Sequence, residues 1–357
     1  MKRRSQIIAA ISLLAGLVLF VYIIERIGWQ EIAARVRTIG IGFLLLLAVS
    51  ALRPLGRAWA WFRCFEPKTR KGELGGFWPV LRARLAADAM GVVTSAGPFV
   101  AESSRIFFFG GRIPVKQASA AAAVELLSYT ASCGLLLLGG MLALLFGVEI
   151  GRQFKMILVS AILLNVVMLV LMAVVFSLKF VVVEHFCDVL KSLIPIAGFH
   201  RLLDKELHQL LELEEYVFDF FRKHPKDFLW VMLGEVAFHL AGIAEVFLTL
   251  KLTGAGSTWL AAFVLEALNR LINLLFAFVP AKVGVDEAGS SWLTGALGIG
   301  TAAGVTLAIY RKLRLLCWTG VGLICLATLT KTTSNSSNQK DIEEDNGTNG
   351  MNGLNGK

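Results

Sequence analysis

The sequence lacks the short motifs that mark the commonest classes of enzyme. It has no P-loop, which argues against ATP hydrolysis by this chain, and no recognisable pairing of a serine or cysteine nucleophile with histidine. No segment between its apolar runs is large enough for a soluble transferase domain. We therefore expect no enzyme activity, and an intramembrane enzyme acting on lipid headgroups is the weakest functional hypothesis.

Cysteine and histidine are both scarce. The five cysteines include no C-x-x-C pair and lie mostly in apolar segments, which is typical of unpaired packing residues. The five histidines are scattered through the chain without the spacing of metal ligands. We therefore expect neither a bound metal nor another cofactor.

Charge is sparse as well, at 17% of 357 residues, whereas 56% are hydrophobic and the mean hydropathy is +0.69. This balance excludes an ordinary soluble protein and predicts an all-α polytopic membrane protein. The net charge of +9 does not indicate nucleic-acid binding, because Lys and Arg lie largely beside the apolar runs. The positive-inside rule explains that placement.

Six apolar segments are long enough to cross a bilayer as helices. They are residues 7–24, 39–62, 118–146, 154–178, 228–250 and 301–330. The first follows three basic residues and precedes no A-x-A-type cleavage site, so we interpret it as an uncleaved anchor with a cytoplasmic N-terminus. The even number of spans then places the C-terminus in the cytoplasm too.

The remaining chain divides into two regions. Residues 179–227 mix charge with apolar residues at helical spacing, which predicts cytoplasmic amphipathic helices lying along the membrane. Residues 331–357 are rich in Asn, Ser and Gly, which predicts a disordered tail. The expected organisation is a transmembrane domain over 1–330 followed by this tail.

Two apolar stretches, residues 77–111 and 259–298, are interrupted by charge, proline and glycine. Residues 278–291 of the second read FVPAKVGVDEAGSS. A charge at the bilayer centre costs roughly 2.5–3.5 kcal/mol, and each Leu, Ile, Phe or Val returns only about 0.3–0.6 kcal/mol. Broken backbone at membrane depth must be buried in protein or line a cavity. We therefore interpret both stretches as re-entrant broken-helix hairpins.

The two hairpin regions form an internal repeat. The repeat matches Arg84, Glu102 and Glu125 with Arg270, Glu287 and Arg311. Corresponding intervals differ in length by one residue. The predicted topology makes the first hairpin enter from the cytoplasm and the second from outside. This predicts an inverted repeat whose broken elements meet near the midplane, as in alternating-access transporters.

The charged residues of the repeat are the candidate binding site. Their guanidinium groups match phosphate oxygens, and their carboxylates can meet amines or neutralise the arginines of an empty site. The candidate substrate-binding residues are Arg84, Glu102, Arg105, Glu125, Arg270, Asp286, Glu287 and Arg311. The alternative is that these charges only pair with one another and hold the hairpins together. Four other cations are expected to snorkel or pair: Arg53, Arg57, Lys312 and Arg314.

The motifs resemble those of a known family. The run Pro280 to Glu287, followed by a Gly/Ala-rich segment leading to Arg311, resembles the second motif of the lysylphosphatidylglycerol synthase transmembrane region, a family of flippase-like integral membrane proteins. Pro98 to Arg105, followed by an Ala-rich segment and Glu125, resembles the first motif, although Ala101 stands where the family often has glycine. The likeness covers the chain to about residue 330.

The resemblance implies lipid translocation or lipid-linked transport in the plasma (inner) membrane of a prokaryote. Bifunctional members of the family carry a C-terminal aminoacyl-transferase domain. This chain has the tail there instead, so we expect no synthase activity.

Together these features predict a protein that moves a lipid or lipid-linked molecule between leaflets. The alternative is a non-transporting membrane partner of a lipid-modifying or glycosyltransferase enzyme, with residues 179–227 as its docking surface. A membrane lipid is the expected substrate, nucleic acid is not an expected partner, and homo-oligomerisation is left open.

Overall fold

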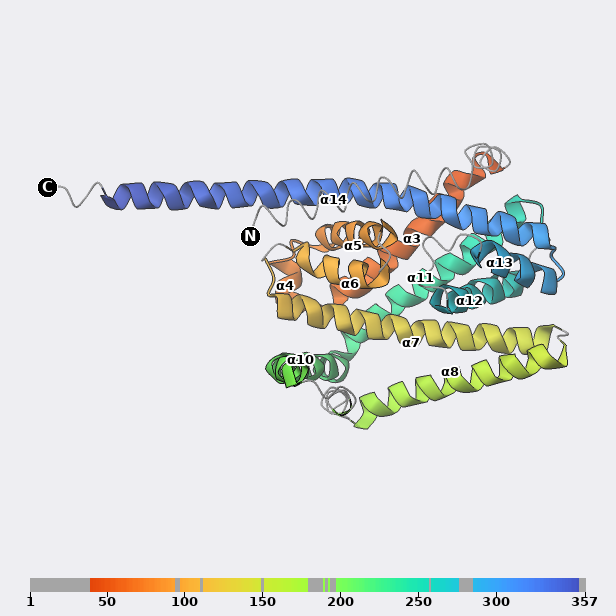
Figure 1. Cartoon of the computed structure of the whole chain (residues 1–357). Coiled ribbons are helices and arrows are strands. Elements are labelled where there is room, and N and C mark those ends of the chain that lie inside the picture. The colour runs from red at the N-terminus through yellow and green to blue at the C-terminus, as the bar shows by residue number, and fades with distance from the viewer. Residues whose placement is uncertain are drawn as a thin grey trace.

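The computed structural model describes residues 39–93, 97–109, 112–148, 151–178, 189, 192, 197–256, 258–275 and 285–352. Within these ranges the regular structure is entirely helical, as predicted (Figure 1). The helices are α3 (Gly42–Arg63), α4 (Pro67–Lys71), α5 (Phe77–Val93), α6 (Gly97–Phe107), α7 (Val115–Gly147), α8 (Arg152–Leu178), α10 (Ala197–Lys223), α11 (Pro225–Leu252), α12 (Trp259–Leu275), α13 (Val285–Ala296) and α14 (Thr301–Asn352).

Five of the described helices are long and apolar enough to cross a membrane: α3, α7, α8, α11 and the Thr301–Leu329 part of α14. They coincide with five of the six predicted spans, and the sixth, residues 7–24, lies outside the described residues. Helix α8 leaves large apolar side chains exposed, among them Leu164, Val167 and Met168. A bundle that exposes so much apolar surface is suited to lipid, and the architecture is that of a helical membrane protein.

Helices α3 and α11 cross at a pair of glycines. A Cβ atom added to Gly56 would lie 2.6 Å from the carbonyl oxygen of Gly234, and one added to Gly234 would lie 2.6 Å from that of Gly56. Only residues without a side chain allow two helix backbones to approach this closely. The crossing sets the position of the charged side chains that follow each glycine, Arg57 and Glu235.

Each of the two predicted hairpin regions contains a set of two short helices and is followed by a long helix. The first comprises the 17-residue α5 and the 11-residue α6, followed by the long α7. The second comprises the 17-residue α12 and the 12-residue α13, followed by the long α14. Helices α5 and α6 lie within the first predicted hairpin region, residues 77–111, and α12 and α13 within the second, residues 259–298. The connecting residues 94–96 and 276–284 lie outside the described part, and a re-entrant path through a membrane stays a prediction.

The two sets of helices interlock. Helix α5 of the first set packs along α14 of the second, and α12 of the second packs along α7 of the first. In Figure 1, α7 and α14 run in opposite directions, and each begins beside its own pair of short helices. Each set of helices therefore supplies part of the packing surface of the other.

Helix α10 supplies much of the amphipathic region predicted over 179–227. Figure 1 shows it nearly end-on beside the start of α7, across the direction of the long helices. Its Val217 and Phe220 are buried, and the Tyr216 hydroxyl donates a hydrogen bond to the carbonyl oxygen of Cys64 at 3.3 Å. Burial raises the pKa of Tyr216 to about 12, so this hydroxyl remains a donor at neutral pH.

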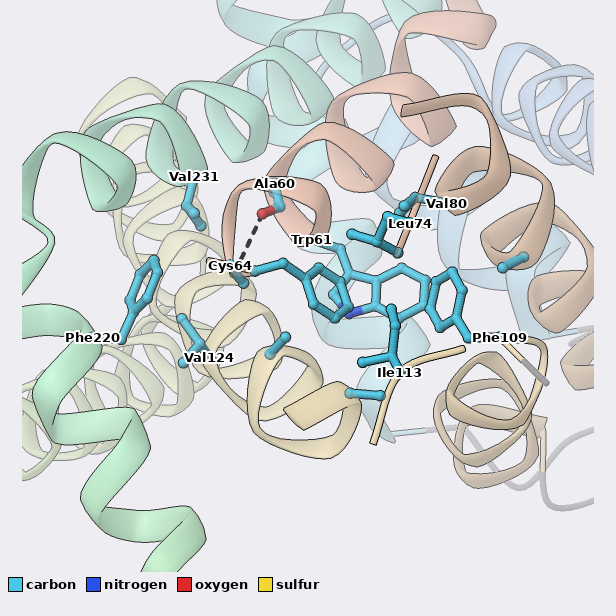
Figure 2. Packing of buried hydrophobic residues seen from close by; sticks show 14 of the residues in the cluster. Ala60, Trp61, Cys64, Leu74, Val80, Phe109, Ile113, Val124, Phe220 and Val231 are labelled. Carbon is cyan, nitrogen blue, oxygen red and sulfur yellow. Dashed lines mark hydrogen bonds between the residues drawn. The ribbon is translucent and has the colours of Figure 1, made fainter. Parts of the chain in front are cut away.

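An aromatic core closes this end of the molecule, and Figure 2 shows its packing. Trp61 of α3 is fully buried, and its ring centroid lies 5.3 Å from that of Phe109. The Arg105 guanidinium stacks over the Trp61 ring at 4.8 Å. The core therefore supports one of the predicted site residues directly.

Helix α14 continues to Asn352, where the composition of residues 331–357 predicts a disordered tail. The extension follows directly from an apolar span, and lengthening an existing helix is much less costly than starting one. The last residues, 353–357, lie outside the described part.

Candidate functional site

Glu125 of α7 is the centre of a buried charge cluster, which we call the Glu125 cluster. Its side chain is fully buried and accepts hydrogen bonds from Arg57 Nε of α3 at 2.9 Å, Arg84 Nη1 of α5 at 3.1 Å and Arg105 Nη1 of α6 at 2.7 Å. Three guanidinium groups from three helices thus converge on one carboxylate. Such an arrangement holds only because the partners satisfy each other away from water.

Two further carboxylates complete the Glu125 cluster. Glu102 pairs with Arg105 one turn along α6, and Asp88 pairs with Arg84 at 3.3 Å. The side chains of Glu102 and Asp88 are 28% and 47% exposed, whereas those of the two arginines are buried. The Glu125 cluster therefore contains three guanidinium groups and three carboxylates. The carboxylates of Glu102 and Asp88 are partly exposed at the surface of the protein.

A second charge cluster surrounds Glu266 of α12, and we call it the Glu266 cluster. The buried Glu266 pairs with Arg270 on its own helix and with Arg53 of α3 at 3.2 Å. Glu245 of α11 pairs with the same Arg53 at 3.3 Å and with Arg314 of α14. Helices α3, α11, α12 and α14 are thus joined through charge.

Arg311 of α14 lies in a polar pocket formed by α12 and α13. Its Nη1 donates to Ser290 Oγ at 2.8 Å and to Asn269 Oδ1 at 3.1 Å, and Asp286 Oδ1 lies 3.5 Å away. The neighbouring Lys312 pairs with Glu287. Asp286 and Glu287 lie in the first turn of α13, where the helix dipole also attracts a negative charge.

Aromatic rings join the two clusters. The Phe238 ring of α11 lies 4.7 Å from the Arg53 guanidinium and 4.8 Å from that of Arg270. Arg57, one turn beyond Arg53 on α3, lies over the Tyr129 ring at 3.7 Å. Helix α3 therefore contributes one arginine to each cluster, with aromatic faces between them.

Replacing Phe238 by leucine should destabilise the protein by about 2 kcal/mol, because two buried guanidinium groups lose the ring face that faces them. Thermal unfolding of the purified protein in detergent measures the effect. Phe238→Tyr keeps the aromatic ring, so it should lose much less stability than the leucine variant. A leucine variant as stable as wild type would contradict this role for the ring.

An apolar cavity of about 440 Å³ lies beside the glycine crossing. Its walls come from α3, α5 and α11 and include Leu52, Trp59, Phe77 and Trp230. Arg57 and Glu235 follow in sequence directly after two of its lining residues, Gly56 and Gly234.

The predicted site residues fall into the two parts of this network. Arg84, Glu102, Arg105 and Glu125 lie together in the Glu125 cluster. Arg270 belongs to the Glu266 cluster, while Asp286, Glu287 and Arg311 lie where α13 meets α14. All eight form ion pairs within the protein. The alternative interpretation, in which these charges only pair with one another, predicts the same. Their binding of substrate stays a prediction.

The four cations expected to snorkel or pair do pair. Arg57 binds Glu125, Arg53 and Arg314 bind Glu245, and Lys312 binds Glu287. Sequence analysis did not identify Glu235 or Glu245, although an isolated glutamate within an apolar run was the available signal. The ring of His239 bonds to Ser132 Oγ through Nε2 at 3.0 Å, but its buried Nδ1 has no hydrogen-bond partner among the described residues.

Comparisons with protein-family models, with curated proteins and with solved structures find no match to this chain. The resemblance to the flippase-like family therefore rests on the two motifs alone.

Proposed function

We propose that this protein moves a lipid with a phosphate-bearing headgroup between the leaflets of a prokaryotic plasma membrane. The arginines of the two halves bind the headgroup, and both termini lie in the cytoplasm. The five apolar helices support a membrane location, and the resemblance to the flippase-like family supports the lipid substrate.

The observation that carries the proposal is a set of unused hydrogen-bond donors. Five arginine nitrogens are buried without a hydrogen-bond partner in the described part of the chain: Arg57 Nη2, Arg63 Nε, Arg105 Nε, Arg270 Nε and Arg311 Nη2. Leaving a buried donor unpaired costs about 1–3 kcal/mol, and more for a charged group. Phosphate oxygens suit guanidinium donors in geometry and charge, so a headgroup can recover this cost. Arg105, Arg270 and Arg311 are among the sequence-predicted site residues, whereas Arg57 and Arg63 are not.

The helix arrangement supports movement as well as binding. The interlocked halves, with α7 and α14 antiparallel, match what an inverted-repeat transporter needs at its central site. Arg84 and Glu266 are each the eighth residue of their 17-residue helices, and Glu125 and Arg311 are each the eleventh residue of their long helices. Counted from the helix starts, Arg84 therefore corresponds to Glu266 rather than to Arg270, its counterpart in the sequence repeat, and corresponding positions carry opposite charges. The apolar cavity beside the crossing of Gly56 and Gly234 offers a place for an acyl chain.

Reconstitution tests the proposal. Purified protein in vesicles containing NBD-labelled phosphatidylglycerol should make the inner-leaflet label accessible to external dithionite within minutes, whereas protein-free vesicles should not. Arg105→Ala and Glu287→Gln should each reduce the rate at least tenfold, because each breaks the headgroup site in one half. Arg222→Gln, an exposed arginine of α10, is the matched control and should behave as wild type.

Two outcomes of this experiment would contradict the proposal. If both site variants fold and move the label as fast as wild type, the headgroup site is wrongly assigned. If folded wild-type protein moves no label, the alternative of a non-transporting enzyme partner gains support. Its docking surface would include α10, whose polar side chains His208 and Lys223 are exposed.

A further inference from the structure

Glu235 of α11 carries a buried carboxylate. Its side chain is fully buried, yet neither Oε1 nor Oε2 has a hydrogen-bond partner in the described ranges. Val231, one turn earlier on the same helix, lies in the apolar core with Cys64 and Val124 (Figure 2). Glu125 is buried to the same extent but accepts hydrogen bonds from three guanidinium groups.

Charged and titratable groups face Glu235 from every helix around it. They are Arg57 of α3 and Cys64 at its end, Arg84 of α5, Arg105 of α6, and Glu125 and Cys133 of α7, with His239 one turn along its own helix. The three arginines are already balanced by Glu125, Glu102 and Asp88. An ionised Glu235 would add a negative charge that nothing else in the Glu125 cluster compensates.

A carboxylate in this position is costly, whereas the neutral acid is not. Burying an ionised carboxylate without a partner costs several kcal/mol even after relaxation, and protonation removes most of that cost. The nearest guanidinium groups already pair with Glu125, and none of them donates a hydrogen bond to Glu235 within the described residues. A proton is therefore the ligand that completes the site.

From this geometry we infer that Glu235 is the proton-binding site of the protein and that the proton moves together with an anionic headgroup. This inference rests on the proposed function. A proton from the aqueous phase binds a carboxylate oxygen of Glu235 to give the neutral acid, and it is released to water on the other side. No redox change is involved.

The direction of coupling follows from charge. An anionic headgroup that enters the Glu125 cluster adds negative charge beside Glu235 and so strengthens proton binding. By linkage, a proton on Glu235 strengthens headgroup binding by the same factor. Lipid and proton should therefore travel in the same direction, and a zwitterionic headgroup should show a weaker coupling.

Infrared spectroscopy tests proton binding without requiring transport. Purified wild-type protein near neutral pH should show the C=O stretch of a buried protonated carboxylic acid, shifted by exchange into D2O and lost at alkaline pH. Glu235→Gln should remove this band, and Glu212→Gln, at a partly exposed glutamate of α10, should leave it unchanged. Absence of the band from wild type, or its persistence in Glu235→Gln, overturns the inference.

Vesicles containing NBD-labelled phosphatidylglycerol test the coupling. A pH gradient should accelerate wild-type lipid movement several-fold in the direction of proton flow and slow it when reversed. Glu235→Gln mimics the neutral acid, so it should fold and lose the response to the gradient. Equal responses in both proteins, or no response in wild type, overturn the coupling. If wild type moves no lipid under any gradient, the coupling fails with the proposed function, while the infrared band still decides proton binding.

Discussion

Replacing Glu125 by glutamine should destabilise the protein by about 3–5 kcal/mol, the usual cost of removing one partner from a buried ion pair. The expected effect is large because one carboxylate serves three guanidinium groups from α3, α5 and α6. Glutamine keeps the shape of the side chain but not its charge. The arginines would then repel one another in a medium that screens them poorly.

The measurement compares two glutamates that are buried equally. Thermal unfolding of Glu125→Gln and Glu235→Gln in the same detergent isolates the effect of partners from the effect of burial, because both side chains are fully buried. Glu125→Gln should unfold at a much lower temperature, whereas Glu235→Gln should stay near wild type. Similar losses in the two variants would contradict the assignment of the charges in the Glu125 cluster.

Gly234→Ala should have the second large effect, of roughly 3 kcal/mol or more, the upper end of what overpacking costs. The new Cβ would lie 2.6 Å from a backbone oxygen of α3, and backbone cannot rotate away as a side chain can. Helices α3 and α11 would have to separate at their crossing. Gly56→Ala should cause the same change from the other side.

Gly320→Ala in α14 provides the control for this experiment. Nothing lies within 4 Å of a Cβ added at Gly320, so alanine should stabilise the helix by roughly 0.5–1 kcal/mol through its higher helix propensity. The two alanine variants should therefore shift the unfolding temperature in opposite directions. A shift of the same sign and size would be inconsistent with a close crossing at Gly234.

The spans could be predicted from sequence because their signals are local. Long apolar runs identify α7, α8 and α11, and the changes in composition at Phe77 and Trp259 mark the starts of α5 and α12. The helical continuation of α14 beyond residue 330 could not be predicted, because Asn, Ser and Gly there have low helix propensity.

The partners of the charges could not be predicted in the same way. Arg53 pairs with a glutamate 192 positions away, and Arg57 with one 68 positions away. These distances along the chain carry no periodic signal, so sequence analysis identified charged residues but not Arg57 as a ligand of Glu125. The sequence shows Glu235 only as an isolated glutamate within an apolar run, whereas its lack of a hydrogen-bond partner among the described residues depends on the packing of four neighbouring helices.

The interlocking of the two halves has a consequence for biogenesis. Helix α5 packs along α14, and α14 is the last of these helices to leave the ribosome. Helix α5 therefore enters the bilayer before its main neighbour exists, although its Arg84 is buried only in the complete fold. Tertiary assembly must wait until nearly the whole polypeptide has been inserted, so interruption of synthesis before α14 should leave a fragment for quality-control proteases to remove.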